Sequence, residues 1–271
     1  TNRIINLSKK RKIMKQIMIK ITAFLFLATL YSCGIDMLNR IEGNKNVISI
    51  NRDISEDFTK VKVSAGIELI IDQGSEVSLT VEADENLHDI IITEVEDGKL
   101  KIYTEKNIWK SAAKKVYLTV NTLEELKASS GSNVITSTIL KATDLNVVSS
   151  SGARLTLELT AVNLTSSTSS GASANIDVNA NNVVSSSSSG SNLKIKGKTT
   201  IHETSASSGS SINAYNLLSK NVTAKVSSGA SISVHATESI DGKASSGGRI
   251  SFEGNPEKIT RKTSSGGSIS N

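Results

Sequence analysis

Residues 127–152 read KASSGSNVITSTILKATDLNVVSSSG, and the Ser-Ser-Gly triplet near each end of this stretch recurs through the rest of the chain. The triplet occurs eight times, with spacings of 21, 19, 19, 19, 20, 18 and 19 residues between successive glycines. A flexible Gly/Ser linker has no reason to keep such a period. We therefore interpret the triplets as equivalent structural turns of a repeated unit, at Gly131, Gly152, Gly171, Gly190, Gly209, Gly229, Gly247 and Gly266.

Apolar residues occupy fixed positions between these corners. The third residue after each glycine is apolar in all eight units, as at Val134 and Leu155, and the fifth is apolar in most units. This alternation is the period-2 signature of a strand with one buried face. A second apolar position lies seven residues before the next glycine, except in the unit from 190 to 209, where we expect it to shift to Ile201. Each unit therefore predicts two short strands with a polar corner between them.

A unit of this length cannot bury an apolar face alone, but stacked units bury a continuous one. The repeat predicts an all-β fold, a parallel β-helix or β-solenoid with coils of about 19 residues over residues 127–271. Each coil would rise about 4.8 Å. Connections between parallel strands favour a right-handed coil. The first coil, 127–152, is the longest, so we expect a bulge where it joins the preceding part of the chain.

Residues 47–126 form a β-rich part without the triplet. Ser64-Ala65-Gly66 is a degenerate copy of the later corner, so we expect the β-structure to be continuous, with this part capping or extending the solenoid. Turn signals such as Asp97-Gly98 separate its strands. The expected strands are Val47–Ile50, Phe58–Val63, Ile67–Ile71, Val77–Glu82, Ile90–Val95, Lys99–Tyr103 and Val116–Val120.

Residues 1–33 comprise an N-terminal extension and a predicted export signal. A basic region begins at Met14, and the apolar run ITAFLFLATL follows at 21–30. This run has the length of a signal-peptide core, whereas a membrane-spanning helix needs about 20 apolar residues. Met14 is the expected translation start, which would leave residues 1–13 upstream of the protein.

Cys33 is the expected lipidation site. It is the one cysteine of the chain, and it ends the segment Leu-Tyr-Ser-Cys at 30–33, which resembles a bacterial lipobox. Lipid chains at Cys33 would attach the protein to a membrane, with residues 34–46 as a polar tether. These features predict a cell-envelope lipoprotein, most simply of the outer membrane. The alternative is a signal peptide with an incidental cysteine.

The positive charge of the chain is concentrated in this signal. The formal net charge is +5, but residues 1–33 carry seven basic residues and no acidic one. The remainder has 24 basic and 26 acidic residues, a net charge of −2. We therefore expect no nucleic-acid partner.

Several segments between residue 47 and the C-terminus resemble the head GIN domain family of autotransporter-type adhesins. They are FTKVKVSAGI (58–67), VSLTVEAD (77–84), DGKLKI (97–102), VYLTV (116–120), LEEL (123–126) and the corner SGSN (130–133). Members of this family fold as β-helices and are common in Bacteroidetes as exported lipoproteins. The resemblance implies the same fold and an adhesin-type role, and a fold transfers between relatives better than a function does.

We expect no catalytic residues, metal site or cofactor. A catalytic serine needs a histidine and an orienting carboxylate, but His202 and His235 fall at different positions of the repeat, and His88 lies outside it. Three scattered histidines and one cysteine give no zinc-ligand spacing. The eight acidic residues after position 126 include no D-x-D pair, and we expect no repeat position to collect them. A polysaccharide-active enzyme on this scaffold stays open as an alternative.

The corner array is the expected interaction surface. Stacked serine hydroxyls would form a ladder that could contact a glycan or protein ligand. Aromatic residues for sugar stacking are scarce, and we expect Tyr103, Tyr117 and Phe252 in the core and Trp109 as a buried anchor. The sequence ends within a further coil, so we also expect self-association through a solenoid end. The leading hypothesis is a non-catalytic surface-interaction protein, and a purely structural envelope protein is a further alternative.

Overall fold

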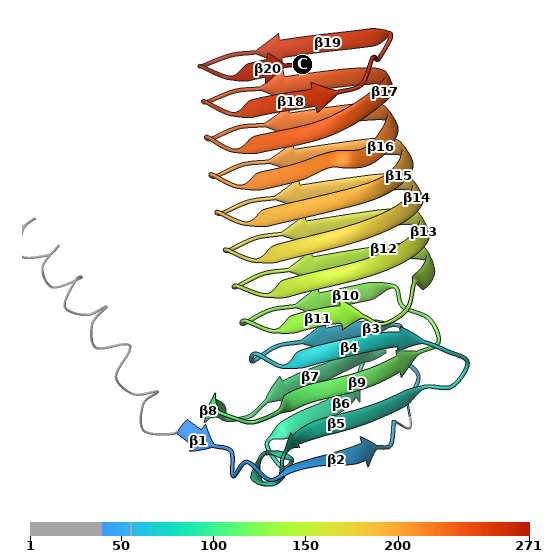
Figure 1. Cartoon of the computed structure of the whole chain (residues 1–271), viewed down its shortest axis with the longest axis vertical. Helices are drawn as coiled ribbons and strands as arrows, with labels where there is room; N and C mark the ends of the chain where they lie inside the picture. The colour runs from blue at the N-terminus through green and yellow to red at the C-terminus, as the bar shows by residue number, and fades with distance from the viewer. Residues whose placement is uncertain (1–39, 55) are drawn as a thin grey trace, which may run out of the picture. The chain divides into compact units, whose positions relative to one another are not determined.

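The computed structural model describes residues 40–54 and 56–271, which are largely β-strand (Figure 1). The predicted signal segment, Cys33 and residues 34–39 of the predicted tether lie outside the described residues. No helix in the described part of the chain is long and apolar enough to cross a membrane.

The strands divide into a two-stranded sheet and a large sheet that follows the solenoid. One 3₁₀ turn, Glu85–Leu87, interrupts them within the described residues. The strands are β1 (Arg40–Glu42), β2 (Val47–Arg52), β3 (Lys60–Val63), β4 (Glu68–Gln73), β5 (Ser78–Asp84), β6 (Ile91–Glu96), β7 (Lys99–Thr104), β8 (Asn107–Lys110), β9 (Lys114–Val120), β10 (Glu125–Ala128), β11 (Asn133–Thr136), β12 (Leu140–Ser149), β13 (Arg154–Thr168), β14 (Ser173–Ser187), β15 (Asn192–Ala206), β16 (Ser211–Val226), β17 (Ser231–Ala244), β18 (Arg249–Glu253), β19 (Lys258–Thr263) and β20 (Ser268–Ser270).

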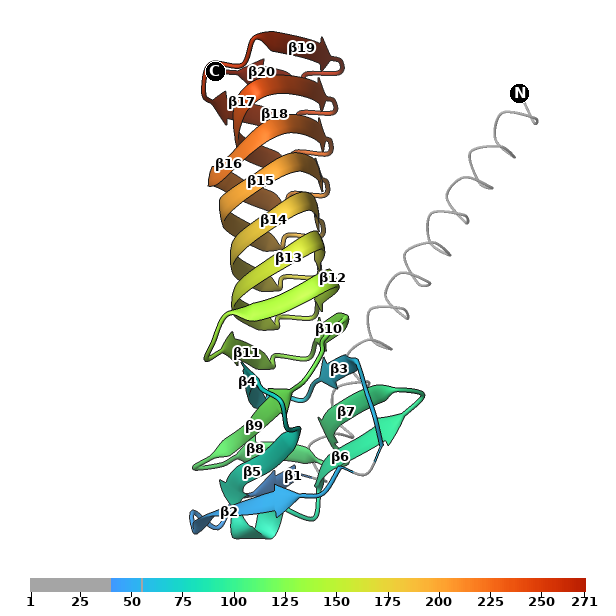
Figure 2. The same ribbon diagram turned by 90° about the vertical axis from the view of Figure 1, so that its right-hand side faces the viewer.

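The repeat half forms the predicted parallel β-solenoid. Strands β13 to β17 each run through nearly a whole coil, and each pairs in parallel with the next. The pairing is in register with the sequence repeat, so Leu155 lies beside Ala174, which lies beside Leu193. Each coil has two limbs, one before and one after its corner. In Figure 1 the limb after each corner, such as β11 or β18, lies nearer the viewer and runs to the right. The other limb lies farther away and returns to the left as the chain climbs. Figure 2 places the same limbs on the left and right of the column, so the coils are right-handed, as predicted.

Each Ser-Ser-Gly corner is a tight turn with two residues of positive φ. In the corner at 188–191, φ is 53° at Ser189 and 67° at Gly190. The N–H of Ser191 donates to the carbonyl of Ser188 at 3.2 Å, which closes a type I′ turn. The N–H of Gly190 donates to the carbonyl of Ser208 in the next corner at 3.1 Å. The sequence predicted the role of the glycine but missed that the second serine also takes the left-handed conformation.

The extra residues of the first coil form the predicted bulge. Between β11 and β13, Ile135 pairs with Thr156. Between β12 and β13, Leu140 pairs with Leu159, so two additional residues are accommodated between Ile135 and Leu140. Ser137 closes this bend against the first half of the chain, because its N–H donates to the carbonyl of Ile71 at 2.9 Å.

The solenoid core consists mainly of stacked aliphatic side chains, among which serines and threonines such as Ser185 and Thr204 and the histidine His202 are also buried. We call a file the set of residues that lie in register on successive coils. One file includes Leu164, Val183, His202, Val222 and Ile240. His202 is 0% exposed, whereas Ile201 is 43% exposed. The prediction that the apolar position shifts to Ile201 is therefore wrong. The chain keeps its register and buries the imidazole instead.

The seven strands predicted in the first half are all present, and two of them belong to the solenoid. Strands β3 and β4 flank the degenerate Ser64-Ala65-Gly66 corner, and Gly66 N–H donates to the Ser130 carbonyl of the next corner at 2.9 Å. β3 pairs in parallel with β10 on one side and β7 on the other, while β4 lies between β11 and β9. Antiparallel pairs β6–β7, β5–β9 and β2–β5 cover the start of the column. This part therefore both extends and caps the solenoid.

A buried carboxylate fastens the loops of this cap. Asp84 accepts hydrogen bonds from the backbone N–H groups of Ala112 and Ala113, both at 2.9 Å, and of Lys45 at 3.0 Å. Burial alone would raise the pKa of Asp84, but these backbone donors stabilise the anion and hold the pKa below its usual value. The ionised carboxylate thus satisfies three backbone groups that no strand pairs.

Strands β1 and β8 form a separate small unit, in which they pair in parallel. Residues 40–42, which the sequence analysis assigned to the tether, are therefore a strand. The Trp109 side chain is 56% exposed, and the guanidinium carbon of Arg40 lies 4.3 Å from its ring centroid. The prediction that Trp109 is a buried anchor is wrong, because a cation–π contact with Arg40 covers one face of the ring and leaves the rest exposed. Phe252 is buried as expected, but Tyr117 is 39% exposed.

Candidate interaction surface

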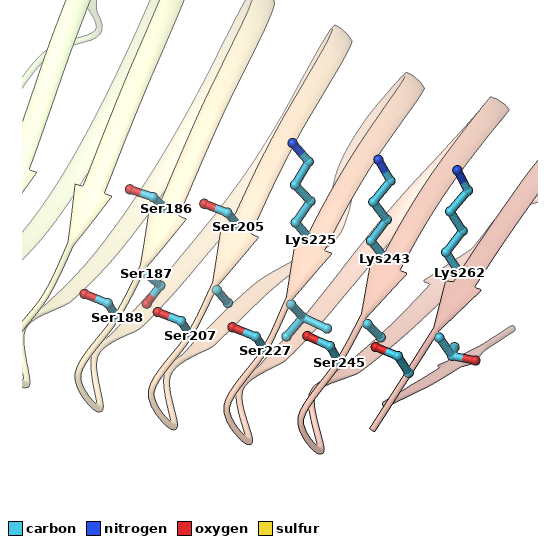
Figure 3. A pocket seen from close by; sticks show the side chains of 15 residues that line it. Ser186, Ser187, Ser188, Ser205, Ser207, Lys225, Ser227, Lys243, Ser245 and Lys262 are labelled. Atoms are coloured by element: carbon cyan, nitrogen blue, oxygen red, sulfur yellow. The ribbon is translucent and has the colours of Figure 1, made fainter. Parts of the chain in front are cut away.

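A groove runs across five successive coils beside the corners, with a volume of about 590 Å³ (Figure 3). One wall is a file of lysine and serine side chains, and the other is a file formed by the first serine of each corner. We call it the lysine–serine groove. Its lining residues are Ser186, Ser187, Ser188, Ser205, Ala206, Ser207, Lys225, Val226, Ser227, Lys243, Ala244, Ser245, Lys262, Thr263 and Ser264.

The lysine wall follows from the register of the strands. Lys225 pairs with Lys243, and Lys243 pairs with Lys262, so the three residues are consecutive members of one file. Ser205 and Ser186 continue the file toward the start of the column. Figure 3 shows the three lysine side chains extended side by side in the same direction. All three are exposed.

These three lysines have no acidic partner, in contrast to Lys196 and Lys220 of the same solenoid. Elsewhere, Lys196 forms an ion pair with Asp177 at 2.8 Å, and Lys220 forms one with Glu238 at 3.3 Å. In the described part of the chain, no carboxylate lies within ion-pair distance of Lys225, Lys243 or Lys262. The groove therefore presents a row of uncompensated positive charge.

This row of lysines was not predicted from the sequence, although a signal for it exists. Each of the three lysines stands four residues before the glycine of its corner. That position faces outward and is not occupied by apolar residues at a regular spacing. It therefore did not contribute to the pattern from which the coils were predicted. Comparing the charged residues at each position counted from the corner glycine would have placed the three lysines in one file.

The corner glycines predicted as structural turns are all in the corners, and their serines are not joined to a histidine. His235 lies 3.9 Å from a carboxylate oxygen of Glu253. His202 Nε2 lies 3.0 Å from Ser185 Oγ, but both residues are buried in the core. Burial lowers the pKa of His202 to about 4, so the ring is neutral at pH 7. This pair has no access to a substrate.

The acidic residues are less dispersed than predicted. Glu158 and Asp177 lie in register on adjacent strands, so one repeat position does collect two carboxylates. Lys196 follows in the same file and pairs with Asp177. The lysine offsets one of the two charges, as in an ordinary charged surface ladder. No group of three or more potential metal ligands occurs among the described residues.

The family model described as "Putative auto-transporter adhesin, head GIN domain" matches residues 57–256. The chain belongs to the head GIN domain family. The match spans most of the solenoid and four of the five coils that line the groove, and it confirms the resemblance seen in the sequence. A search among curated proteins found no match.

Three solved structures of similar fold come from Parabacteroides. A "putative adhesin" from Parabacteroides distasonis has a TM-score of 0.80 at 20% identity, covering 86% of this chain and 99% of its own. A "putative adhesin" from Parabacteroides merdae has a TM-score of 0.78 at 19% identity, with coverages of 86% and 99%. A "Putative lipid binding protein" from P. distasonis has a TM-score of 0.76 at 24% identity, with coverages of 85% and 98%. At these identities the likeness establishes a shared fold for the head GIN domain.

Proposed function

We propose that this head GIN domain protein is a non-catalytic, lipid-anchored protein of the cell envelope, whose solenoid is an adhesin-type module for contact with glycans or proteins. The lysine–serine groove is the observation that carries this proposal. It is a continuous surface of lysine, serine and small apolar side chains that crosses five coils, whereas an enzyme site needs a few groups that converge on one reacting bond. The adhesin description of the family and of the two Parabacteroides structures supports the same role.

Binding without turnover is the expected result when the full chain, in a non-ionic detergent, is screened against panels of glycans and extracellular-matrix proteins. Retention on an immobilised ligand and release of reducing ends from polysaccharides would be measured in parallel. Retention with no reducing-end release supports an interaction module. No release is expected, because the corner serines have no neighbouring base that could activate them as nucleophiles.

Reducing-end release without retention would contradict the proposal and favour a polysaccharide-active enzyme. The Glu158–Asp177 pair is where such chemistry would be sought, since carboxylate pairs carry out glycoside hydrolysis. A Glu158→Gln variant would then lose the release activity, whereas it leaves a binding module unaffected.

Lipidation of Cys33 is a separate part of the proposal, supported by the apolar segment and lipobox-like residues before it. We expect radiolabelled palmitate to be incorporated by cells that express the parent chain, and the protein to sediment with membranes. Cys33→Ala should abolish labelling and move the protein to the soluble fraction, because the thiol is the attachment atom. Equal labelling of both proteins would show that Cys33 is not the anchor.

A further inference from the structure

We infer that the lysine–serine groove binds a linear anionic polysaccharide, such as a polyuronate, with the polymer lying along the axis of the solenoid. The inference rests on the proposed function as a surface-interaction module and adds the chemical class of its ligand. It is carried by the uncompensated lysine file, the hydroxyl file opposite it and the straight course of the groove between them (Figure 3).

The row of three lysines destabilises the folded solenoid unless an anion binds beside it. Like charges that lie directly opposite on neighbouring strands are destabilising. Lys225, Lys243 and Lys262 are such neighbours, one coil or about 4.8 Å apart along the column. Asp241 stands two residues before Lys243 on β17, yet it makes no ion pair with these lysines among the described residues. A bound polyanion would replace this repulsion with attraction.

The other end of the same file shows how the chain compensates such charges where no ligand is needed. Lys101, Lys62 and Lys127 are its members in the first half of the chain. Lys101 is paired with Glu96, and Lys127 with Glu125 at 2.8 Å. Lys62 lies between them without an ion pair among the described residues, so two of the three lysines at that end are compensated, whereas none of the three in the groove is.

The serine wall supplies hydrogen-bonding groups for a sugar chain. The hydroxyls of Ser207, Ser227 and Ser245 point the same way along the groove (Figure 3). None of them makes a side-chain hydrogen bond within the part of the chain that the structure describes. A hydroxyl can both donate to a carboxylate and accept from a sugar hydroxyl. The two walls together therefore match a polymer that carries a negative charge and hydroxyl groups on each unit.

The groove suits a polysaccharide better than a membrane or a nucleic acid. None of its fifteen lining residues is aromatic. Proteins that bind single-stranded nucleic acids stack the bases on aromatic side chains. Interfacial membrane binders insert large apolar or aromatic side chains, whereas the apolar lining here consists of alanine, valine and the threonine methyl group. A linear, hydroxyl-rich polyanion needs neither feature.

The test measures the affinity of the full chain, in a non-ionic detergent, for polygalacturonate by isothermal titration calorimetry. The groove variant is Lys225→Ser, Lys243→Ser and Lys262→Ser, since serine already occupies this file at Ser186 and Ser205. The parent should bind polygalacturonate but not neutral dextran, and its affinity should fall as salt is added. The groove variant should bind at least about tenfold more weakly.

The matched control removes the same charge from lysines that do not line the groove, through Lys194→Ser, Lys198→Ser and Lys258→Ser, which are exposed and form no ion pair within the described residues. Its affinity should stay within about twofold of the parent. The groove variant should melt at the parent's temperature or slightly above it at low salt, because the repulsion is gone. This melting temperature separates lost binding from lost folding.

Three outcomes would overturn the inference. Equal weakening in both variants would show a response to net charge alone. Binding of phosphatidylglycerol vesicles, lost in the groove variant, without binding of polygalacturonate would assign the groove to a lipid surface. Retention of the parent on another glycan or matrix protein, with no polyanion binding, would remove the inference and leave the proposed function in place. Loss of the proposed function would instead appear as reducing-end release without retention.

Discussion

Replacing Gly197 by alanine is expected to destabilise the solenoid by about 4 kcal/mol or more, the largest effect of any single substitution considered for the column. Gly197 lies on β15 with φ of 118°, a conformation that L side chains rarely adopt. A Cβ atom there would lie 1.9 Å from the carbonyl oxygen and 3.1 Å from the nitrogen of Val178 in the preceding coil. These neighbours are backbone atoms held by parallel pairing, so the overlap can be relieved only by separating β14 from β15.

The matched control is Gly190→Ala in a corner. Gly190 also has positive φ, but a Cβ there meets no atom within 4 Å. Its cost is therefore the conformational strain alone, about 1 kcal/mol. Thermal melting of the two variants should show a much larger decrease for Gly197→Ala, and hydrogen exchange should show lost protection at β14 and β15. Similar melting temperatures would contradict the close backbone approach at Gly197.

The contrast between these glycines shows what the sequence can and cannot reveal. Gly190 was found because its triplet recurs at a fixed spacing, which a single sequence displays directly. Seven residues after the corner glycine, glycine stands in two units, as Gly197 and Gly254, while other units carry residues such as Val178 there, so no regular period marks the position. The need for glycine there arises from how closely two coils approach, and that is a tertiary property.

The topology of the first half was likewise only partly predictable. Its strands were found because alternating apolar residues and turn signals are local features. Their order in the sheet could not be predicted in the same way. β3 lies between β7 and β10, and β4 lies between β9 and β11. A coil formed early in the chain is thus enclosed by later strands. Partner choice among strands depends on contacts distant in sequence, which local patterns do not specify.

The buried histidine was missed for a related reason. The sequence offered Ile201 as the apolar residue nearest the expected position, and hydrophobicity favoured it over His202. Register decided otherwise, because a shift of one residue would turn every following side chain of the strand to the opposite face. Burying one imidazole beside a hydroxyl partner costs less free energy than turning all the following side chains of the strand to the opposite face.

Stability is expected to decrease by about 3 kcal/mol between pH 6.5 and pH 4 because of this histidine. The pKa of His202 is lowered to about 4 by burial, and its Nε2 lies 3.0 Å from Ser185 Oγ, which donates to Thr204 Oγ1 at 2.9 Å. In the unfolded chain the imidazole binds a proton below about pH 6.5. The folded protein binds that proton only near pH 4, so acid favours the unfolded state throughout this interval. Above pH 6.5 both states are neutral and the contribution is constant.

The variant His202→Val should remove this dependence, since valine occupies the neighbouring positions of the file at Val183 and Val222. The difference in unfolding free energy between variant and parent should grow in the variant's favour from pH 7.5 to pH 4. Acid effects from other groups, including Asp84, are common to both proteins and cancel in this difference. The control Ile201→Val, on the adjacent exposed position, should keep the parent's slope. If the parent and His202→Val instead lose stability in parallel, the imidazole exchanges protons in the folded state as readily as in the unfolded one, and the solenoid core at this coil is open to water.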